Sequence, residues 1–390
     1  MKKKIAILGS TGSIGKTLIN LIKKDKKNFE ITLLTANKNY KELIKQAKYF
    51  KVRNLIISNK DSFNKAQRKL KNQKFNIYQN YNFINKIFKK KNDFIMSSIT
   101  GLEGLEPTLN SIKFTKNILI ANKEAIICGW NLIQKEMLKH KTNFIPIDSE
   151  HFSIWSLLKK NEKSQIDKIY ITASGGPFLR LPKKKFDKIS VKSALQHPNW
   201  KMGKKITIDS STMMNKVFEI IEAKKIFNLN FNQLDITIHS ESYVHALIKF
   251  SDGMIKIIAH DTTMKIPIFN SIYLNKKKFI KSNEISFDKL NRLNFKKIDL
   301  KKFPSVKLLK NLPNKNSLYE TALVSANDAF VEHFINKKIK YNDIIYKLTK
   351  IMNSKEIKKL KKIVPTRISQ VITVNKYVRK QINLKYVQQK

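Results

Sequence analysis

The stretch KIAILGSTGSIG, residues 4–15, combines a short apolar run with a glycine-rich turn and the start of a new apolar pattern. Residues 4–8 predict a buried strand, and the apolar spacing from about Ile14 to Lys24 predicts a helix. Glycines in a turn between a strand and a helix let the backbone approach a pyrophosphate, which the helix N-terminus then stabilises. Glycines also punctuate ordinary turns, but this position directly after the first strand favours a dinucleotide site.

Strand and helix patterns alternate along the first 147 residues, which predicts a parallel, doubly wound sheet in an N-terminal Rossmann-like domain, 1–147. We expect a central catalytic α/β domain at 148–275, a charged linker at 276–301 and a small C-terminal helical domain at 302–390. The expected strands are residues 29–35, 55–57, 94–96, 118–120, 143–147, 168–172, 236–239 and 246–250. The expected later helices are residues 213–226, 325–335 and 342–352.

The chain carries a formal net charge of +49 from 78 basic and 29 acidic residues, which raises nucleic acid or a membrane surface as a partner. Only six of the basic residues are arginines, and the lysines are spread along the whole chain. A nucleic-acid surface usually gathers its charge on one face and uses arginine forks. We therefore expect a solvated surface and neither a specific nucleic-acid partner nor a membrane partner.

A single cysteine, Cys128, excludes disulfides within the chain. The sequence holds no apolar run near 18 residues, and no apolar signal segment follows the lysines at its start. We expect a soluble, cytoplasmic protein.

The end of the second expected strand distinguishes NAD from NADP. An NAD site usually has an acid there for the ribose hydroxyls, whereas this sequence has Ala36-Asn37-Lys38-Asn39. The missing acid and the cation Lys38 predict NADPH, although Lys38 could also be one more lysine in a lysine-rich chain.

Two carboxylates, Asp148 and Glu150, follow the strand that ends at Ile147. In an extended backbone they would project to the same side, and the pair would suit Mg²⁺ or Mn²⁺. Such a pair is often only a solvated loop, but its position after a strand in an acid-poor chain favours a metal site.

A phosphate site is predicted by small and polar residues further along the chain. The loop SGGPF, residues 174–178, can offer amides and the Ser174 hydroxyl to an anion. On a helix, Asn215 and Glu219 would share a face and Lys216 would lie beside Glu219. These residues could grip a phosphate and add a third metal carboxylate, or they could form an ordinary amphipathic helix with a surface ion pair.

Together, these segments resemble the 1-deoxy-D-xylulose-5-phosphate reductoisomerase family. The resemblance rests on GSTGSIG (9–15), ANKE (121–124), DSEH (148–151), SGGPF (174–178) and HPNWKMGKKITIDSSTMMNK (197–216), and extends to TALVSAND (321–328). It implies a homodimer that uses NADPH and a divalent cation. The implied reaction rearranges 1-deoxy-D-xylulose 5-phosphate, a sugar phosphate, and reduces it to 2-C-methyl-D-erythritol 4-phosphate, an isoprenoid precursor.

The resemblance also implies roles for individual residues. The implied metal ligands are Asp148, Glu150 and Glu219. The implied NADPH contacts are Thr11, Gly12, Ser13, Ile14, Asn37, Lys38, Asn39, Asn122, Glu124 and Gly203. The implied substrate contacts are Lys123, Ser149, Ser174, His197, Ser210, Asn215 and Lys216, and Trp200 matches the indole of a closing loop. The chain departs from the family pattern at Asn37, Ala125, Val217, Ser240-Glu241 and Asp328, none of which is an implied metal or phosphate ligand.

Two other functions compete with this interpretation. Another reductase with an N-terminal Rossmann-like domain, such as a semialdehyde dehydrogenase, would share the glycine turn but needs a nucleophilic cysteine. A polyanion-binding protein would explain the charge but leaves DSEH and SGGPF without a purpose.

Overall fold

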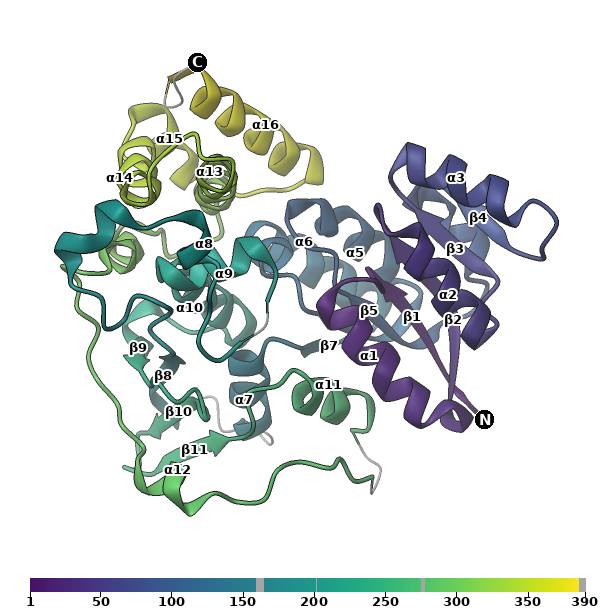
Figure 1. Cartoon of the computed structure of the whole chain (residues 1–390), viewed down its shortest axis with the longest axis horizontal. Coiled ribbons are helices and arrows are strands. Elements are labelled where there is room, and N and C mark those ends of the chain that lie inside the picture. The colour runs from purple at the N-terminus through teal and green to yellow at the C-terminus, as the bar shows by residue number, and fades with distance from the viewer. Residues whose placement is uncertain (159–164, 201, 275–277, 386–390) are drawn as a thin grey trace. The chain divides into compact units, whose positions relative to one another are not determined.

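The computed structural model describes residues 1–158, 165–200, 202–274 and 278–385 (Figure 1). The chain divides into two compact units. The first unit comprises Met1–Ala125, Leu132–Phe152 and Met264–Lys281, and the second comprises Ile126–Asn131, Ser153–Thr263 and Ser282–Lys390. The domain limits expected from sequence run consecutively along the chain, and they stay predictions.

The first unit is built on a seven-stranded sheet with the order β4-β3-β2-β1-β5-β6-β7. Every neighbouring pair in this sheet is parallel, which confirms the predicted fold class. The strand order reverses between β1 and β5, and ligands of doubly wound sheets bind outside the carboxyl ends of the strands at such a point. The strands are β1 Lys3–Leu8, β2 Phe29–Ala36, β3 Asn54–Ile57, β4 Asn76–Tyr78, β5 Asn92–Ser97, β6 Thr115–Ile120 and β7 Asn143–Pro146.

Helices connect these parallel strands because a parallel connection must cross from one end of the sheet to the other. Their apolar faces are buried together with the wholly buried β1 side chains of Ile5, Ile7 and Leu8. The connecting helices are α1 Ser13–Lys24, α2 Tyr40–Phe50, α3 Lys60–Leu70, α4 Ile84–Ile87 and α5 Leu105–Ile112; α11 Lys265–Ile272, from much later in the chain, belongs to the same unit and contacts α1. Two more helices, α6 Lys123–His140 and α7 Ser149–Leu157, have residues in both units.

The second unit contains a four-stranded sheet with the order β11-β10-β8-β9. Strand β10 is antiparallel to β8 and β11, whereas β8 and β9 are parallel. The helix α10, Met214–Phe227, contributes Ile220, Ala223 and Phe227 to a core shared with Ile169 and Ile171 of β8. The strands are β8 Ile166–Ala173, β9 Leu234–Ile238, β10 Val244–Phe250 and β11 Ile255–Ala259.

Beyond Pro304 the second unit is mainly helical, as the sequence predicted; three short helices of the described residues come earlier in the chain, one of them, α12 Phe287–Asn291, within the expected linker. Figure 1 shows the last four helices gathered at the C-terminal end of the chain. Within the expected linker, Lys296 pairs with Ile238 of β9, and residues 276 and 277 lie outside the described part. Besides α10, the helices that lie wholly in the second unit are α8 Val191–Ala194, α9 Lys204–Ser211, α12 Phe287–Asn291, α13 Leu318–Ile335, α14 Tyr341–Met352, α15 Lys355–Lys359 and α16 Ile368–Lys385. None of the helices in the described ranges combines the length and the apolar character that a bilayer span requires.

Candidate nucleotide, metal and phosphate sites

The glycine turn follows β1 at the carboxyl end of the first sheet. Gly9 has a φ of +83°, and a Cβ there would lie 2.8 Å from the Ser98 carbonyl oxygen. At Gly15 a Cβ would lie 2.6 Å from the Cα of Ser10, so α1 approaches the turn as closely as only glycine permits. The N-cap residue of α1 is Gly12, which offers no side chain to the first-turn amides. The predicted contacts Thr11, Gly12, Ser13 and Ile14 therefore surround a helix N-terminus suited to an anion.

The loop after β2 is joined to this turn. The Ser10 amide donates to the Thr35 carbonyl at 2.9 Å, and the Gly9 amide donates to the Thr35 hydroxyl at 2.9 Å. Immediately beyond β2, Asn37, Lys38 and Asn39 are exposed. The Asn39 side chain accepts from the Glu42 amide at 3.2 Å and so caps α2. The cationic Lys38 is thus presented beside the turn at the same edge of the sheet.

Asn122 has a clear structural role at the start of α6. Its Oδ1 accepts from the Ala125 amide at 2.7 Å, which caps the helix, and its Nδ2 donates to the Gly101 carbonyl at 2.7 Å. The side chain therefore joins the segments that follow β5 and β6. The neighbouring Glu124 is buried. The remaining predicted nucleotide contact, Gly203, belongs to the second unit, where it is the N-cap of α9.

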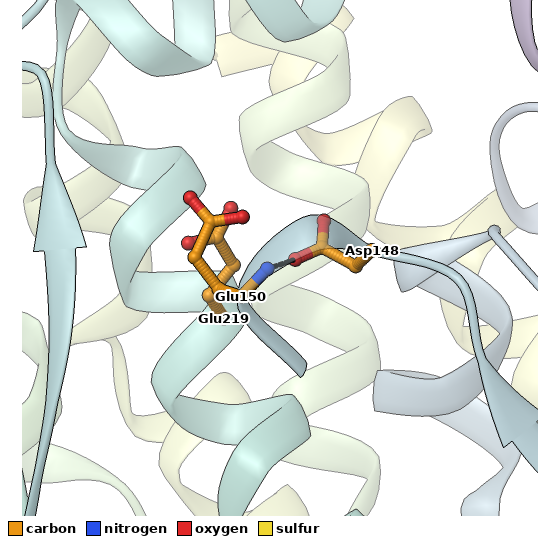
Figure 2. A group of neighbouring side chains, drawn as sticks. All are labelled: Asp148, Glu150 and Glu219. Atoms are coloured by element: carbon orange, nitrogen blue, oxygen red, sulfur yellow. Dashed lines mark hydrogen bonds between the residues drawn. The ribbon is translucent and has the colours of Figure 1, made fainter. Parts of the chain in front are cut away.

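Three carboxylates lie close together, two at the start of α7 and one on α10 (Figure 2). One oxygen from each of Asp148, Glu150 and Glu219 lies within 4.8 Å of the other two. The extended backbone that the sequence suggested for Asp148 and Glu150 is wrong, because α7 begins at Ser149. Asp148 instead precedes the helix, and its Oδ1 accepts from the Glu150 amide at 3.3 Å. The two carboxylates are neighbours through helix initiation and not through strand alternation.

Cations and donors surround the carboxylate cluster. Lys123 forms an ion pair with Asp148, and Nζ of Lys216 lies 2.5 Å from Glu219. Nδ2 of Asn215 donates to Glu219 at 2.5 Å, so the predicted helical neighbours do share a face. Three carboxylates held this close repel one another unless a cation lies among them. An all-oxygen donor set of this kind fits Mg²⁺ or Mn²⁺.

The hydroxyl of Ser149 donates to Glu150 at 2.6 Å, which places this predicted substrate residue against a predicted metal ligand. His151 belongs to the DSEH motif but was given no role from the sequence, and its Nδ1 lies 3.2 Å from Asp148. Its position three residues after Asp148 on a helix start was the signal that could have identified it.

An imidazole and two hydroxyls form a second polar group, which lies wholly in the second unit. Nε2 of His197 lies 3.2 Å from Oγ of both Ser174 and Ser210. Nδ1 of His197 accepts from the amides of Asn199 at 3.1 Å and Trp200 at 3.0 Å. Because Nδ1 accepts, a neutral ring carries its proton on Nε2 and points a donor at the two hydroxyls.

The environment of His197 keeps its ring neutral. Burial, together with repulsion by Lys216, lowers the pKa of His197 to about 4. The ring is therefore a neutral donor at physiological pH. With two serine hydroxyls and the Lys216 ammonium, it forms a donor-rich group of the type that binds phosphate.

Backbone geometry holds the SGGPF loop against α9. Gly175 and Gly176 have φ values of +85° and +65°, which glycine adopts without strain. A Cβ on Gly176 would lie 2.8 Å from the carbonyl oxygen of Ser210. The Gly176 amide also donates to Ser174 Oγ at 3.2 Å, which orients that hydroxyl.

The segment between His197 and α9 contains Trp200, whose ring lies edge-on to His245 with centroids 6.2 Å apart. The sequence did not single out His245. The residue after Trp200, Lys201, lies outside the described residues.

Comparisons with known proteins cover nearly the whole chain. Family models described as 1-deoxy-D-xylulose 5-phosphate reductoisomerase, its C-terminal domain, and DXP reductoisomerase C-terminal domain match residues 5–129, 144–227 and 261–381. The 1-deoxy-D-xylulose 5-phosphate reductoisomerase of Pelagibacter ubique is 59% identical over 378 residues, which cover 96% of this chain and 97% of that one. The enzyme of that name from Sulfurihydrogenibium is 36% identical and covers 87% of this chain and 88% of its own.

Solved structures agree with the sequence comparisons. The reductoisomerase of Zymomonas mobilis in complex with NADPH has a TM-score of 0.87 at 27% identity, over 99% of this chain and 100% of that chain. A DOX-P reductoisomerase in complex with NADPH, fosmidomycin and magnesium has a TM-score of 0.90 at 32% identity, over 98% of both chains.

Proposed function

The chain belongs to the 1-deoxy-D-xylulose 5-phosphate reductoisomerase family, and from that premise we propose which of its residues bind the metal, the substrate phosphate and NADPH. The enzyme rearranges 1-deoxy-D-xylulose 5-phosphate and reduces it with NADPH to 2-C-methyl-D-erythritol 4-phosphate, a precursor of isoprenoids. The observation that carries this assignment of roles is the cluster of Asp148, Glu150 and Glu219, whose oxygens lie close enough together to hold a metal ion.

The carboxylate cluster is the proposed metal site. A divalent cation held by these three residues supplies Lewis acidity to the substrate oxygens next to the ketone. Lys123 and Lys216 lie against the cluster through Asp148 and Glu219, and each offsets part of the negative charge. Asn215 fixes the rotamer of Glu219, so its carboxylate is oriented before a ligand arrives.

The substrate phosphate is proposed to bind Ser174, His197, Ser210, Asn215 and Lys216. The neutral Nε2–H of His197 and the two hydroxyls beside it supply hydrogen bonds, and Lys216 supplies charge. Binding energy at the phosphate, remote from the reacting carbons, can orient the ketone. The Trp200 amide donates to Nδ1 of His197, so Trp200 lies next to the phosphate-binding donors. This position supports the role that the resemblance gives it, in a loop that covers bound substrate.

The glycine turn and the loop after β2 are the proposed NADPH site. NADPH supplies the hydride for the reduction. The N-terminus of α1 would stabilise the pyrophosphate, and Lys38 would pair with the 2′-phosphate. Asn122 and Glu124 lie at the start of α6, after β6, which is separated from β1 by β5 and ends on the same side of the parallel sheet; this supports their assignment to the NADPH site.

A homodimer is proposed from the resemblance and from the edge of the second sheet. β11 ends that sheet, and its side chains Ile255 and Ile257 are 61% and 46% exposed. An apolar edge strand is a template for pairing with another chain. We also propose a cytoplasmic location, because NADPH is the reductant and the lone Cys128 forms no disulfide within the chain.

The competing functions have less support. Cys128 is only 2% exposed and is a poor position for the nucleophile that a semialdehyde dehydrogenase needs. A polyanion-binding role offers no account of the carboxylate cluster.

The decisive experiment measures NADPH oxidation with 1-deoxy-D-xylulose 5-phosphate in the presence and absence of Mg²⁺ or Mn²⁺. We expect metal-dependent oxidation that yields 2-C-methyl-D-erythritol 4-phosphate, identified by mass spectrometry. Oxidation that continued at the full rate after chelation would exclude the proposed metal role. Sedimentation of the purified protein tests the dimer, and Ile257→Lys should shift it toward the monomer.

A further inference from the structure

Tyr341, the first residue of α14, contacts two separate segments of the proposed phosphate site. Its hydroxyl donates to the Ser211 carbonyl at 2.8 Å and lies 3.2 Å from the Ser211 hydroxyl. Its ring packs edge-on against Phe178 of the SGGPF loop, with centroids 5.3 Å apart and an interplanar angle of 80°. One side chain from the C-terminal helices therefore reaches both α9 and the loop.

The loop SGGPF and α9 also contact each other directly, beside the proposed phosphate site. The Gly176 backbone is so close to the Ser210 carbonyl that a Cβ would lie 2.8 Å from it. Ser210 and Ser174, which precedes Gly176 by two residues, both present their hydroxyls to the same His197 nitrogen. Any shift of α9 relative to the loop would therefore change the spacing of the two hydroxyls.

The surroundings of Tyr341 make it rigid. The residue is 4% exposed, and its ring also packs against Phe186 and Phe334 at centroid distances of 5.9 and 5.7 Å. Burial raises the pKa of its phenol, so the hydroxyl stays protonated and remains a donor. The acceptor residue, Ser211, is wholly buried. Loss of the donor would thus remove a hydrogen bond that water cannot replace.

We propose that Tyr341 is a positioning residue that fixes the distance between Ser174 and Ser210 and so sets the affinity for the substrate phosphate. The inference rests on the proposed function, because it assumes that these two serines bind the phosphate. It adds to that function a residue that lies 130 positions beyond Ser211 and touches no substrate itself.

The alternative is that the Tyr341 hydroxyl only stabilises the folded protein. A second tyrosine, Tyr319, provides a matched control. Tyr319 on α13 is also buried, and its hydroxyl donates to the Met352 carbonyl at 3.3 Å. Tyr319→Phe removes the same hydroxyl from the same helical region without changing a bond to α9. A purely structural hydroxyl would make the two variants alike.

The test compares Tyr341→Phe, Tyr319→Phe and Ser210→Ala in the full-length enzyme. The measurements are KM and kcat for 1-deoxy-D-xylulose 5-phosphate, competitive inhibition by inorganic phosphate, NADPH affinity and Tm. We expect Tyr341→Phe to raise KM and the phosphate inhibition constant together by roughly two- to tenfold, the effect of one lost hydrogen bond. The value of kcat and the NADPH affinity should stay near those of the wild type. Tyr319→Phe should lower Tm alone.

The outcomes separate the two levels of the proposal. If Ser210→Ala raises KM while Tyr341→Phe matches Tyr319→Phe in KM and phosphate inhibition, the positioning role is wrong and the phosphate site stands. If Ser210→Ala leaves KM and phosphate inhibition unchanged, the phosphate site is wrong, and the role of Tyr341 is overturned with it.

Discussion

The Nε2 atom of His197 lies 3.2 Å from the hydroxyl oxygen of Ser210, the two residues being 13 positions apart in the chain. Because backbone amides occupy the other ring nitrogen, Nδ1, the ring can meet Ser210 only as a neutral donor through Nε2. This relationship links a protonation state to the geometry of the proposed phosphate site, and it makes the site sensitive to pH in a defined direction.

The stability of the protein should depend on the protonation of His197. Its pKa is lowered from 6.5 to about 4, first by burial and then by Lys216. Between these values the unfolded chain binds a proton that the folded chain does not. The stabilising contribution of the neutral ring is therefore present above about pH 6.5 and is lost as the pH falls toward 4.

The variant His197→Gln cannot titrate, so it should lose less free energy of unfolding than the wild type between about pH 7 and pH 5. Chemical denaturation of both proteins at each pH measures the difference. Parallel pH profiles for the wild type and the variant would contradict the lowered pKa.

Removal of either buried glutamate from the carboxylate cluster should stop the reaction without disturbing the nucleotide site. We expect Glu150→Gln and Glu219→Gln to reduce turnover by more than about a hundredfold, because metal ligation is lost. NADPH affinity, measured by fluorescence titration, should remain close to that of the wild type. Glu332→Gln serves as the control, since Glu332 is exposed and pairs with Arg379 on the helical side of the second unit.

Metal binding should also be visible without turnover. Mg²⁺ or Mn²⁺ should raise the Tm of the wild type, because a ligand that binds only the folded state stabilises it. The same ions should leave the Tm of Glu219→Gln nearly unchanged. An equal rise of Tm in both proteins would place the metal elsewhere.

The enzyme should strongly prefer NADPH over NADH. Lys38 is exposed after β2, and the segment from Ala36 to Asn39 contains no acidic residue that could bind the ribose hydroxyls of NADH. Lys38→Asp should reduce the ratio of kcat/KM for the two nucleotides by roughly tenfold or more, the effect of a hydrogen bond to a charged group. Lys45→Asp, an exposed change of the same charge on α2, should leave the ratio unaltered. Equal use of both nucleotides by the wild type would refute the assignment.

The formal charge of +49 should not act as a nucleic-acid-binding device. Weak binding at low salt is expected from so many lysines, and such binding weakens steeply as salt is added. At about 0.15 M salt, where screening is strong, the active protein should elute from a sizing column free of DNA and RNA. Nuclease treatment should leave turnover unchanged. Submicromolar binding at that ionic strength would indicate that the lysines serve a second function.

Much of the secondary structure could be predicted because its signals are local. The apolar runs of β1 and β2 and the helical spacing of α10 each lie within one stretch of chain, and the observed bounds differ from the expected ones by a few residues. Two of the strands in the described residues were missed. β4 has only three residues, and β11 has only five, of which Ile255 and Ile257 are exposed at the edge of the sheet.

The roles at the site were accessible from sequence only where a motif was contiguous. DSEH placed Asp148 and Glu150 together correctly but for the wrong reason, since helix initiation and not an extended strand makes them neighbours. The helical spacing of Asn215, Lys216 and Glu219 offered Glu219 as a third metal carboxylate but left an ordinary surface ion pair open, and the resemblance assigned it to the metal. Local spacing alone could not place Glu219 beside Asp148, because α10 lies far along the chain.

The sequence by itself determined the parallel sheet, the glycine turn and the family, because each is signalled by patterns or motifs that are contiguous stretches of the chain. Tertiary structure alone decided that Tyr341 holds Ser211, that His151 lies against Asp148, and that His197 meets two serines through a neutral nitrogen. The physical reason is that periodicity reports which face of an element is buried, whereas the partners of a buried polar group are chosen by how distant elements pack.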